Sequence, residues 1–450
     1  MEFYYNIRSV FKKGVIVLEK DFSSPEYQRS RIAYMLECMF EYFVSLLVAD
    51  AFLAKLLSSV GFKDGDIGII SSFISLAFIF QLCSLLLSSK RGSKKKMILI
   101  CDGIGQMLFF ALYLLPFIGI DANLRRVLVY VFIIGAYMSK YLVSTYLFQW
   151  ANSYVHPEKR ASYSGNKEII SLIGGIIFSL VMGAVFDWFE AGGNLAGGFL
   201  FLAGAALVSN ICQFICLILI KKESPEELAH QKKKNWGDIL SHTFGNKNFI
   251  RLVIIATLWK SAQYFTIGFL GTFKTDTSGN GLAMTVLLVQ IITMVGNILR
   301  IPATSIFGKY SDKKSFASGF YLSMFFAVAA FACNVFTTEQ TWFLIIGYTI
   351  LYSICSAGCG QNAFNMTYSY VDSEYIAEAM ALQNCISGVC AFLCSVVAGK
   401  ILDAIQAAGN TFFGIPVFGQ QILSLISLLL CVVCIIFMRM TIMKEKVMKQ

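Results

Sequence analysis

The sequence contains few charged residues. Asp, Glu, Lys and Arg make up 14% of the chain, whereas soluble domains carry about 25%. This scarcity excludes an ordinary soluble fold. Hydrophobic residues reach 57%, 40 of the 450 residues are Phe, and the mean hydropathy is +0.67. The composition therefore predicts an all-α polytopic membrane protein.

Histidine is also scarce, and the usual signatures of enzymes are missing. The three His residues, His156, His230 and His242, do not cluster with Cys, so we expect no metal site. We find no nucleotide-binding motif and no nucleophile paired with a base, so we expect neither an enzyme nor a cofactor. Most of the 13 Cys lie inside apolar runs, which argues against a disulfide framework. The mixed, charged N-terminus does not resemble a cleavable signal peptide.

Apolar runs long enough to cross a bilayer follow one another along the chain. A spanning helix needs about 20 such residues. We predict twelve spans, near residues 31–58, 66–88, 97–119, 126–152, 166–188, 196–220, 249–272, 281–307, 315–337, 342–368, 382–404 and 419–438.

A repeated segment divides the spans into two halves. SYVHPEKRA begins at Ser153 and SYVDSEYIA begins at Ser369, each at the end of the fourth span of its half. Further matches at the same spacing are Tyr154/Tyr370, Val155/Val371, Glu158/Glu374, Ala161/Ala377, Ile170/Ile386 and Ser171/Ser387. A repeat spaced near half the chain length predicts two similar bundles. The predicted parts are an N-terminal segment 1–30, a six-helix bundle 31–220, a linker 221–248, a second six-helix bundle 249–438 and a tail 439–450.

Lys and Arg are distributed unevenly between the two ends of the spans. Most occur in KRGSKKK, HPEKR, the linker, GKYSDKKS and KEKVMK, whereas few lie at the opposite ends: Lys55, Lys63, Arg125, Arg126, Lys274 and Lys400. Because basic loops stay in the cytoplasm, we predict a multi-pass protein of the cell (inner) membrane with both termini cytoplasmic. Topology explains the net charge of +10, so we expect lipid rather than nucleic acid as the surrounding partner, and a monomer.

Ionisable side chains occur in the middle of three spans. Glu41 lies about 15 Å along the first span and Lys260 about 16 Å along the seventh, and Lys140 is central in the fourth. A charge at the bilayer centre costs about 2.5–3.5 kcal/mol, so these groups should face each other or a watery cavity. Glu37 lies one turn from Glu41, and like charges at this spacing repel, so we expect proton coupling at Glu37 or Glu41. Two alternatives are a structural Glu41–Lys140 pair and an interfacial Glu37. Asp50, near the outer end, is expected in water.

Polar residues form stripes on the fourth, seventh and tenth spans. Residues three, four and seven positions apart share a helix face, which predicts a common cavity lining. The predicted substrate-binding residues are Tyr137, Lys140, Ser144, Trp259, Lys260, Gln263, Tyr264, Gln361, Asn362 and Asn365. Alternatively, the amides of the tenth span bond helix to helix.

The segment FGKYSDKKSF, between the eighth and ninth spans, resembles the loop signature of the major facilitator superfamily. The glycine, acidic and basic positions of that signature correspond to Gly308, Asp312 and Lys313, and its later glycine is Ser315 here. HPEKRA places Arg160 at the usual basic position of another family loop. The resemblance covers all twelve spans. It implies the facilitator fold, with spans one, four, seven and ten around a central cavity, and gating by Gly308, Asp312, Lys313 and Arg160.

Together, the resemblance and the buried charges predict a secondary active transporter that works by alternating access. The expected solute is small, polar and organic, either a sugar or glycoside or an organic anion, moved by symport with a proton. A proton-driven multidrug exporter is the alternative, although the exporter signature ends in Gly-Pro and the fifth span, SLIGGIIFSLVMGAVFDWF, has no Pro. A transporter-like receptor that binds without translocation is the alternative from another class.

Overall fold

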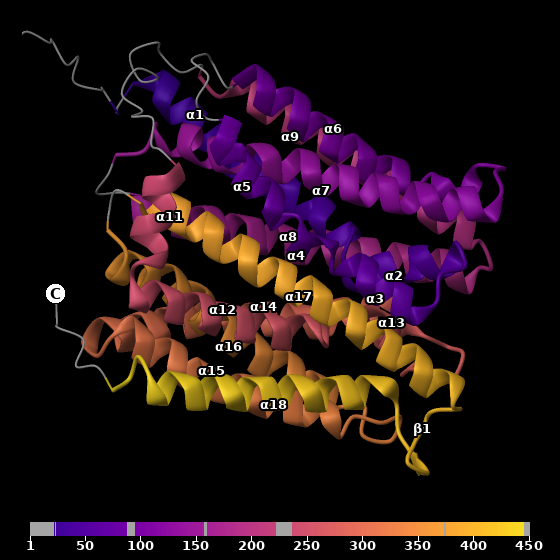
Figure 1. Cartoon of the computed structure of the whole chain (residues 1–450). Helices are drawn as coiled ribbons and strands as arrows, with labels where there is room; N and C mark the ends of the chain where they lie inside the picture. The colour runs from indigo at the N-terminus through magenta and orange to yellow at the C-terminus, as the bar shows by residue number, and fades with distance from the viewer. Residues whose placement is uncertain are drawn as a thin grey trace, which may run out of the picture.

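The computed structural model describes residues 22, 24–87, 95–156, 160–221, 236–372 and 375–444. Most of the basic loop after the second span, half of the linker and the chain ends therefore lie outside the described residues. Long helices run roughly side by side, and the two halves of the chain occupy opposite sides of the molecule (Figure 1). We call the end at which α1 begins the terminal end, and the end with the β1–β2 hairpin the distal end (left and right in Figure 1).

The N-terminal half contains six spans, two of which are broken into shorter helices. The first span is a pair of helices bent by 45°, and the second consists of three short helices. The elements are α1 (Pro25–Leu47), α2 (Asp50–Ser59), α3 (Asp64–Ser71), α4 (Phe73–Leu76), α5 (Phe78–Leu87), α6 (Lys95–Leu112), η1 (Leu115–Phe117), α7 (Ala122–Asn152), α8 (Arg160–Ala191) and α9 (Leu195–Leu219).

The C-terminal half repeats this pattern. Its first span is again broken, between α12 and α13, and a short helix, α11, precedes it. The elements are α11 (Trp236–Phe244), α12 (Lys247–Tyr264), α13 (Ile267–Thr275), α14 (Val286–Lys313), α15 (Phe316–Val335), α16 (Leu344–Tyr370), α17 (Ile376–Ala407), the antiparallel strands β1 (Thr411–Phe412) and β2 (Ile415–Pro416), and α18 (Gly419–Met440).

The described helices account for the predicted twelve spans. Ten helical segments are long and apolar enough to cross a membrane, and the bent α1–α2 pair makes eleven. Helix α6 packs on α7 and α9 in the place of the third span, and its lower apolarity comes from Lys95, Lys96 and Asp102. The structure is therefore the twelve-helix fold that the sequence predicts, while the residue boundaries of the two bundles stay a prediction.

The repeated SYV segments have the same structural role in both halves. Arg31, near the start of α1, donates from Nη1 to the carbonyl oxygen of Tyr154 over 3.1 Å. Asn246, which caps α12, donates from Nδ2 to the carbonyl oxygen of Tyr370 over 2.6 Å. In each half, a tyrosine carbonyl thus joins the end of the fourth span to the start of the first. This shared contact gives a structural reason for the repeat.

The facilitator-like motif differs from its expected form, because it does not lie in a loop. Helix α14 continues to Lys313, past Pro302 in its interior, so Gly308 and Asp312 lie in its last turns. The N-cap of α15 is Ser315, whose Oγ accepts a hydrogen bond from the amide of Ser318 over 3.1 Å. Serine is a favoured N-cap residue, which explains why the chain turns at Ser315.

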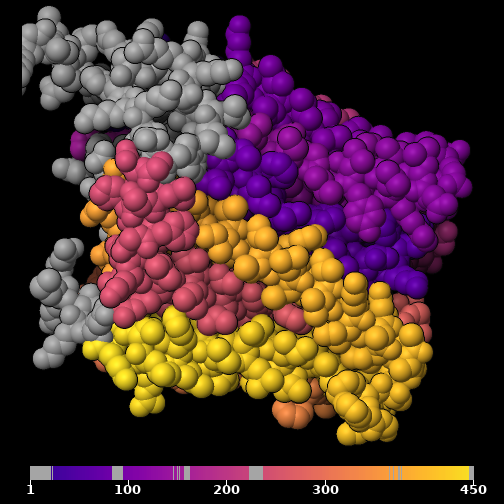
Figure 2. All heavy atoms as spheres, in the orientation of Figure 1, coloured from indigo at the N-terminus to yellow at the C-terminus, as the bar shows by residue number. Residues whose placement is uncertain are grey.

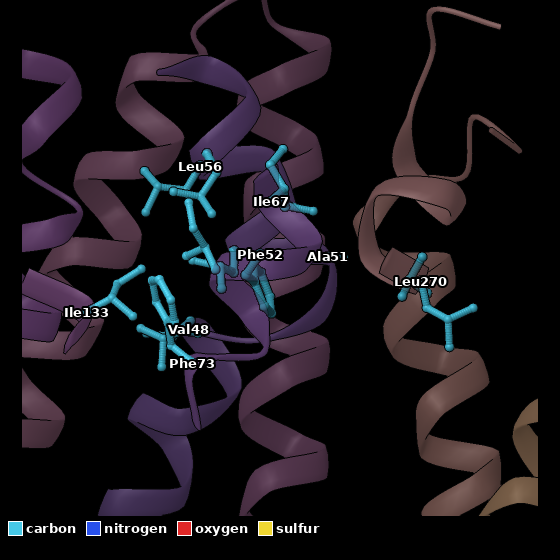
Figure 3. Packing of buried hydrophobic residues seen from close by; sticks show 14 of the residues in the cluster. Val48, Ala51, Phe52, Leu56, Ile67, Phe73, Ile133 and Leu270 are labelled. Atoms are coloured by element: carbon cyan, nitrogen blue, oxygen red, sulfur yellow. The ribbon is translucent and has the colours of Figure 1, made fainter. Parts of the chain in front are cut away.

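Apolar side chains cover the outside of the bundle and also close the contact between the halves. Ile177 and Val208 are 60% and 61% exposed, as expected for side chains that face lipid. Towards the distal end, buried side chains of the N-terminal half, such as Phe52 and Ile67, share one cluster with Leu270 of α13 (Figure 3). Helix α17 packs on α3, α4 and α5, and lies along the boundary between the halves (Figure 2).

Candidate functional site

A cavity of about 410 Å³ lies between the two halves. Aromatic side chains from both halves form much of its wall: Phe109, Tyr137, Tyr141, Tyr264, Tyr348 and Tyr352. Hydroxyl groups supply further hydrogen-bonding positions: Ser45, Ser71, Thr293, Thr349, Ser353 and Ser356. Such a lining offers flat apolar faces together with neutral donors and acceptors, a combination that suits a small polar organic molecule.

An ion pair connects α1 and α7 at the edge of this cavity. The Nζ atom of Lys140 lies 2.6 Å from Oε1 of Glu41, and the two side chains are 20% and 28% exposed. A second cavity, of about 430 Å³, is lined by both residues and by the further charged side chains Lys167, Glu168 and Arg300. The structure thus brings together two of the buried charges that the sequence singled out, and leaves both in contact with the cavities.

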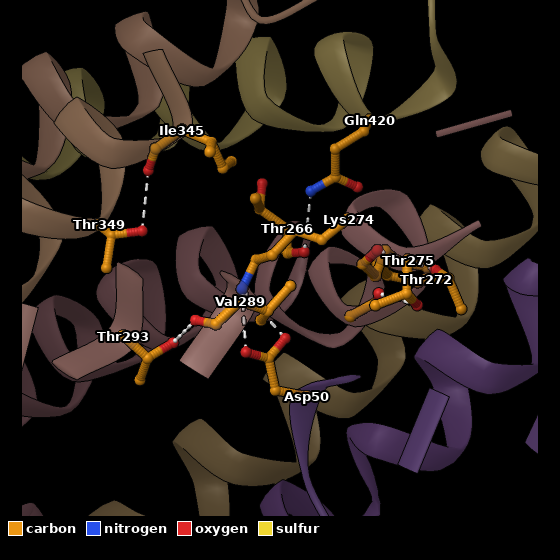
Figure 4. Close-up of polar contacts among 12 residues, drawn as sticks. Asp50, Thr266, Thr272, Lys274, Thr275, Val289, Thr293, Ile345, Thr349 and Gln420 are labelled. Carbon is orange, nitrogen blue, oxygen red and sulfur yellow. Dashed lines mark hydrogen bonds and ion pairs between the residues drawn. The ribbon is translucent and has the colours of Figure 1, made fainter. Parts of the chain in front are cut away.

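A second ion pair joins the halves at the distal side of the cavity. Lys274 on α13 is 5% exposed, and its Nζ lies 3.1 and 2.9 Å from the two carboxylate oxygens of Asp50 on α2 (Figure 4). Asp50 was expected in water near the outer end, and its side chain is 31% exposed, but it also pairs with the other half of the molecule. Both residues line the 410 Å³ cavity. The sequence interpretation missed Lys274, since it assigned this residue to the outer surface.

Glycines allow the helix backbones of the two halves to touch at the same distal side. A Cβ atom on Gly268 would lie 2.5 Å from the carbonyl oxygen of Gly68, and one on Gly271 would lie 2.5 Å from that of Asp50. Asp187 on α8 adds a capping contact, because its carboxylate accepts from the amides of Val286 and Leu287, at the start of α14, over 2.9 and 2.7 Å. A carboxylate at a helix N-terminus is stabilising. The distal side of the cavity is therefore closed in this structure.

Three predicted residues of the seventh span lie next to the cavity in different ways. Tyr264 lines it directly. Gln263 donates from Nε2 to the hydroxyl of Tyr352 over 2.6 Å, and the buried Trp259 stacks on the same ring at 6.3 Å. These two residues thus position a tyrosine of the cavity wall.

Lys260 lies between the halves rather than in the cavity lining. Its Nζ donates to Oδ1 of Asn384 on α17 over 3.1 Å and lies 4.1 Å from the ring centroid of Phe78 on α5. Among the described residues, Lys260 has no anionic partner. Its ammonium group instead makes a cation–π contact and one hydrogen bond to an amide oxygen. The structure does not bring Lys260 to Glu41 or Lys140.

The predicted amides of the tenth span lie nearer the terminal end than the cavity. Asn362 is fully buried, accepts from Oγ of Ser311 over 2.6 Å and donates to the carbonyl of Gly358 over 2.8 Å. Gln361 packs close to Gly308. This arrangement matches the alternative in which the amides join helices. The cavity instead meets the tenth span nearer its start, at Tyr348, Thr349, Tyr352, Ser353 and Ser356.

Two further predicted binding residues, Ser144 and Asn365, form hydrogen bonds within their own helices. Ser144 donates to the carbonyl of Tyr141 over 3.1 Å, and the backbone carbonyl of Asn365 accepts from Ser369 over 3.1 Å. Neither side chain is part of the two cavity walls described above. Their binding roles stay predictions.

The gating residues lie at the terminal end, apart from the cavity. Asp312 and Lys313 are exposed in the last turn of α14. Arg160 is the first residue of α8, and its side chain lies outside the described part of the chain. The gating role of these residues and of Gly308 stays a prediction.

A buried polar group that includes one predicted residue lies behind the ion pair. Glu37 is 0% exposed, and Nε2 of Gln213 on α9 lies 3.1 Å from its Oε1 and 3.0 Å from Oδ2 of Asp102 on α6. The sequence interpretation missed Asp102 and Gln213. Asp102 gave a usable signal, because it is an ionisable residue inside the third apolar run.

Comparisons with known proteins agree with this architecture. Residues 32–395 match the model of a family described as the Major Facilitator Superfamily. A search of the curated proteins found no match.

Solved structures share the fold at low sequence identity. The nucleoside transporter NupG is 16% identical, with a TM-score of 0.68 over 94% of this chain and 100% of that chain. A bacterial homolog of the human lysosomal transporter Spinster, inward-facing and occupied, is 13% identical, with a TM-score of 0.65 over 95% and 98%. A bacterial homologue of the iron transporter ferroportin, inward-facing, is 13% identical, with a TM-score of 0.60 over 92% and 98%. The score against its outward-facing state is 0.56.

Proposed function

The chain belongs to the Major Facilitator Superfamily, and on this basis we propose that it is a secondary active transporter that moves a small polar organic solute by alternating access. The solute is a sugar or glycoside, or an organic anion. It enters by symport with a proton.

The observation that carries the proposal is the cavity between the two halves. Its volume of about 410 Å³ is near the lower limit of the range of about 300–1,000 Å³ for small-molecule sites. Tyrosine rings and hydroxyl groups suit the faces and hydroxyls of a sugar. Lys140 offers a cation to a carboxylate or to an acceptor-rich solute.

The proposed orientation puts the terminal end in the cytoplasm of the cell membrane, with both termini on that side and the protein acting as a monomer. The bias of Lys and Arg towards the terminal end supports this orientation. The closed distal side and the second cavity at Lys140 and Glu41 then correspond to an inward-facing state. The higher similarity to the inward-facing than to the outward-facing ferroportin homologue supports the same assignment.

Proton coupling is proposed at the Glu41–Lys140 pair. When Glu41 is ionised it neutralises Lys140, and when Glu41 takes a proton the Lys140 ammonium is released. A free ammonium in a cavity of low polarity requires a new acceptor. The solute supplies that acceptor, so binding of the proton and binding of the solute favour each other.

A competition panel on the purified protein tests the substrate class. It includes neutral sugars, glycosides, nucleosides, carboxylic acids and hydrophobic cations, and it reads out thermal stabilisation of the full chain. A saturating ligand at about 100 times its Kd adds about 2.7 kcal/mol of stability, which such an assay resolves. We expect sugars, glycosides or organic anions to stabilise the protein.

The panel also separates the alternatives. Stabilisation by hydrophobic cations alone would contradict the proposal and favour the proton-driven multidrug exporter. A ligand that stabilises the protein but does not enter proteoliposomes would favour the transporter-like receptor.

A further inference from the structure

A pair of carboxyl groups lies deep inside the N-terminal half, away from the cavity. Glu37 on α1 is 0% exposed and Asp102 on α6 is 4% exposed. Neither forms an ion pair within the described part of the chain. Gln213 on α9, also 0% exposed, is the group between them, with Nε2 at 3.1 Å from the one carboxyl and 3.0 Å from the other.

The charge balance around this pair requires a proton. The surrounding titratable and charged groups are Glu41, Cys38 and Tyr34 on α1, Lys140 on α7, Lys167 and Tyr163 on α8, and Cys216 on α9. Of the two cations, Lys140 is already paired with Glu41, and Lys167 lines the second cavity. Two more carboxylates buried without a cation would be very costly, and buried acids in such places neutralise instead.

Buried amide oxygens on α6 and α9, near this pair, lack hydrogen-bond donors, which is an independent observation. The side-chain oxygens of Gln213, Gln106 and Asn210 are buried and lack hydrogen-bond partners, and all three residues are at most 3% exposed. The oxygen and nitrogen of an amide exchange places when it flips. Gln213 therefore donates to a carboxylate and, after a flip, accepts from a carboxylic acid. One bridging residue serves both protonation states.

A short route connects the pair to the ion pair at the cavity. One carboxylate oxygen of Glu37 lies within 4.8 Å of one carboxylate oxygen of Glu41, a gap that one water molecule bridges. Glu41 in turn contacts Lys140, which lines both cavities. The order is thus Asp102, Gln213, Glu37, Glu41 and Lys140.

We propose that Glu37, Asp102 and Gln213 form a proton-binding site behind the Glu41–Lys140 pair. This inference rests on the proposed function and specifies where the coupled proton is stored. The proton leaves the acid form of the Glu37–Asp102 pair and binds Glu41, whose ion pair with Lys140 opens. The pair takes up another proton as it gives one up, because two carboxylates without a cation would be very costly there.

Infrared difference spectroscopy of the full-length protein in lipid tests the site without any solute. At neutral pH we expect a carbonyl-stretch band of a buried carboxylic acid that shifts in D₂O. Asp102→Asn or Glu37→Gln removes this band. The control is Asp187→Asn, because Asp187 lies apart from this group and its carboxylate accepts two backbone amides. If the isosteric variants fail to fold, Gln213→Leu keeps both acids and should shift the band.

The results separate this inference from the proposed function. Absence of the band at neutral pH, or a band that is unchanged in both the Asp102→Asn and the Glu37→Gln protein, overturns the site. Solute uptake that is the same with and without a pH gradient contradicts proton coupling, even when the band is present. Loss of the band in the two acid variants, but not in Asp187→Asn, supports the site.

Discussion

At the scale of single residues, proton coupling depends on the Glu41–Lys140 pair. Opposite charges at 2.6 Å stabilise each other. The two side chains are 28% and 20% exposed and line a cavity. This position gives protons and solute access to the pair.

Glu41→Gln is the first prediction. Glutamine keeps the shape of the side chain but cannot carry the proton, so exchange of solute across the membrane should continue. A pH unit is worth about 1.4 kcal/mol per proton, or about tenfold accumulation of solute. We expect this ratio to fall to about one in the variant. Uptake into proteoliposomes with and without an imposed pH gradient measures both quantities.

The matched control for this variant is Glu190→Gln. Glu190 also forms an ion pair with a lysine, Lys55, at 2.7 Å. Both residues lie outside the cavity walls described above. Gradient-driven accumulation should stay near the wild-type ratio in the control. A normal ratio in Glu41→Gln, or an equal loss in both variants, would rule out a specific role of Glu41 in coupling.

At the scale of elements, the broken first span of each half forms the distal closure. Helix α2 continues the first span and α13 continues the seventh, and the two meet through Gly271 and Asp50. The backbone of Asp50 has a φ of 44°, in the left-handed region, which costs energy for a residue other than glycine. The ion pair with Lys274 offsets this strain and ties the break in the helix to the contact between the halves.

Gly268→Ala should weaken the distal closure. Its new methyl group would meet the backbone of Gly68, which yields only if α13 and α3 move apart. Such overpacking destabilises the closed state by about 1–3 kcal/mol and leaves the open state unaffected. We expect faster hydrogen exchange of the amides of α2, α3 and α13, measured by mass spectrometry.

Gly204→Ala provides the comparison, because a Cβ atom on this glycine of α9 meets nothing within 4 Å. Exchange should stay at wild-type rates in that variant. Equal exchange in Gly268→Ala and the wild-type protein would mean that the glycine contacts do not hold the distal side closed.

The elements also illustrate which parts of the fold are predictable from sequence. Length and apolarity locate the spans, because a bilayer requires them. They do not reveal the breaks at Val48 and Phe265, where neither proline nor glycine interrupts the sequence and contacts with other helices decide the path. The motif at Gly308 was expected in a loop but lies in a helix. A Lys-rich segment can extend a helix as readily as it forms a loop, so its composition does not decide between the two.

At the scale of the whole molecule, the sequence predicts the two similar halves and only part of the site. Glu41, Lys140, Tyr137 and Tyr264 were predicted from charge and helix periodicity, and the structure brings them to the cavities. Contacts between residues far apart in the chain leave no periodic signal. Asp50–Lys274 and Glu37–Gln213–Asp102 belong to this group: the packing of the two halves forms the first contact, and the packing of α1, α6 and α9 within the N-terminal half forms the second.

In the proposed mechanism, the two halves alternate access to one cavity and couple a solute to a proton. The most direct test uses proteoliposomes that contain the purified protein and a pH-sensitive dye, with the solute that stabilises the protein best. Addition of this solute to one side should drive protons across the membrane with it, and an imposed pH gradient should drive accumulation of about tenfold per pH unit for one proton. Solute that equilibrates without proton movement, or that binds and never crosses, would contradict the claim.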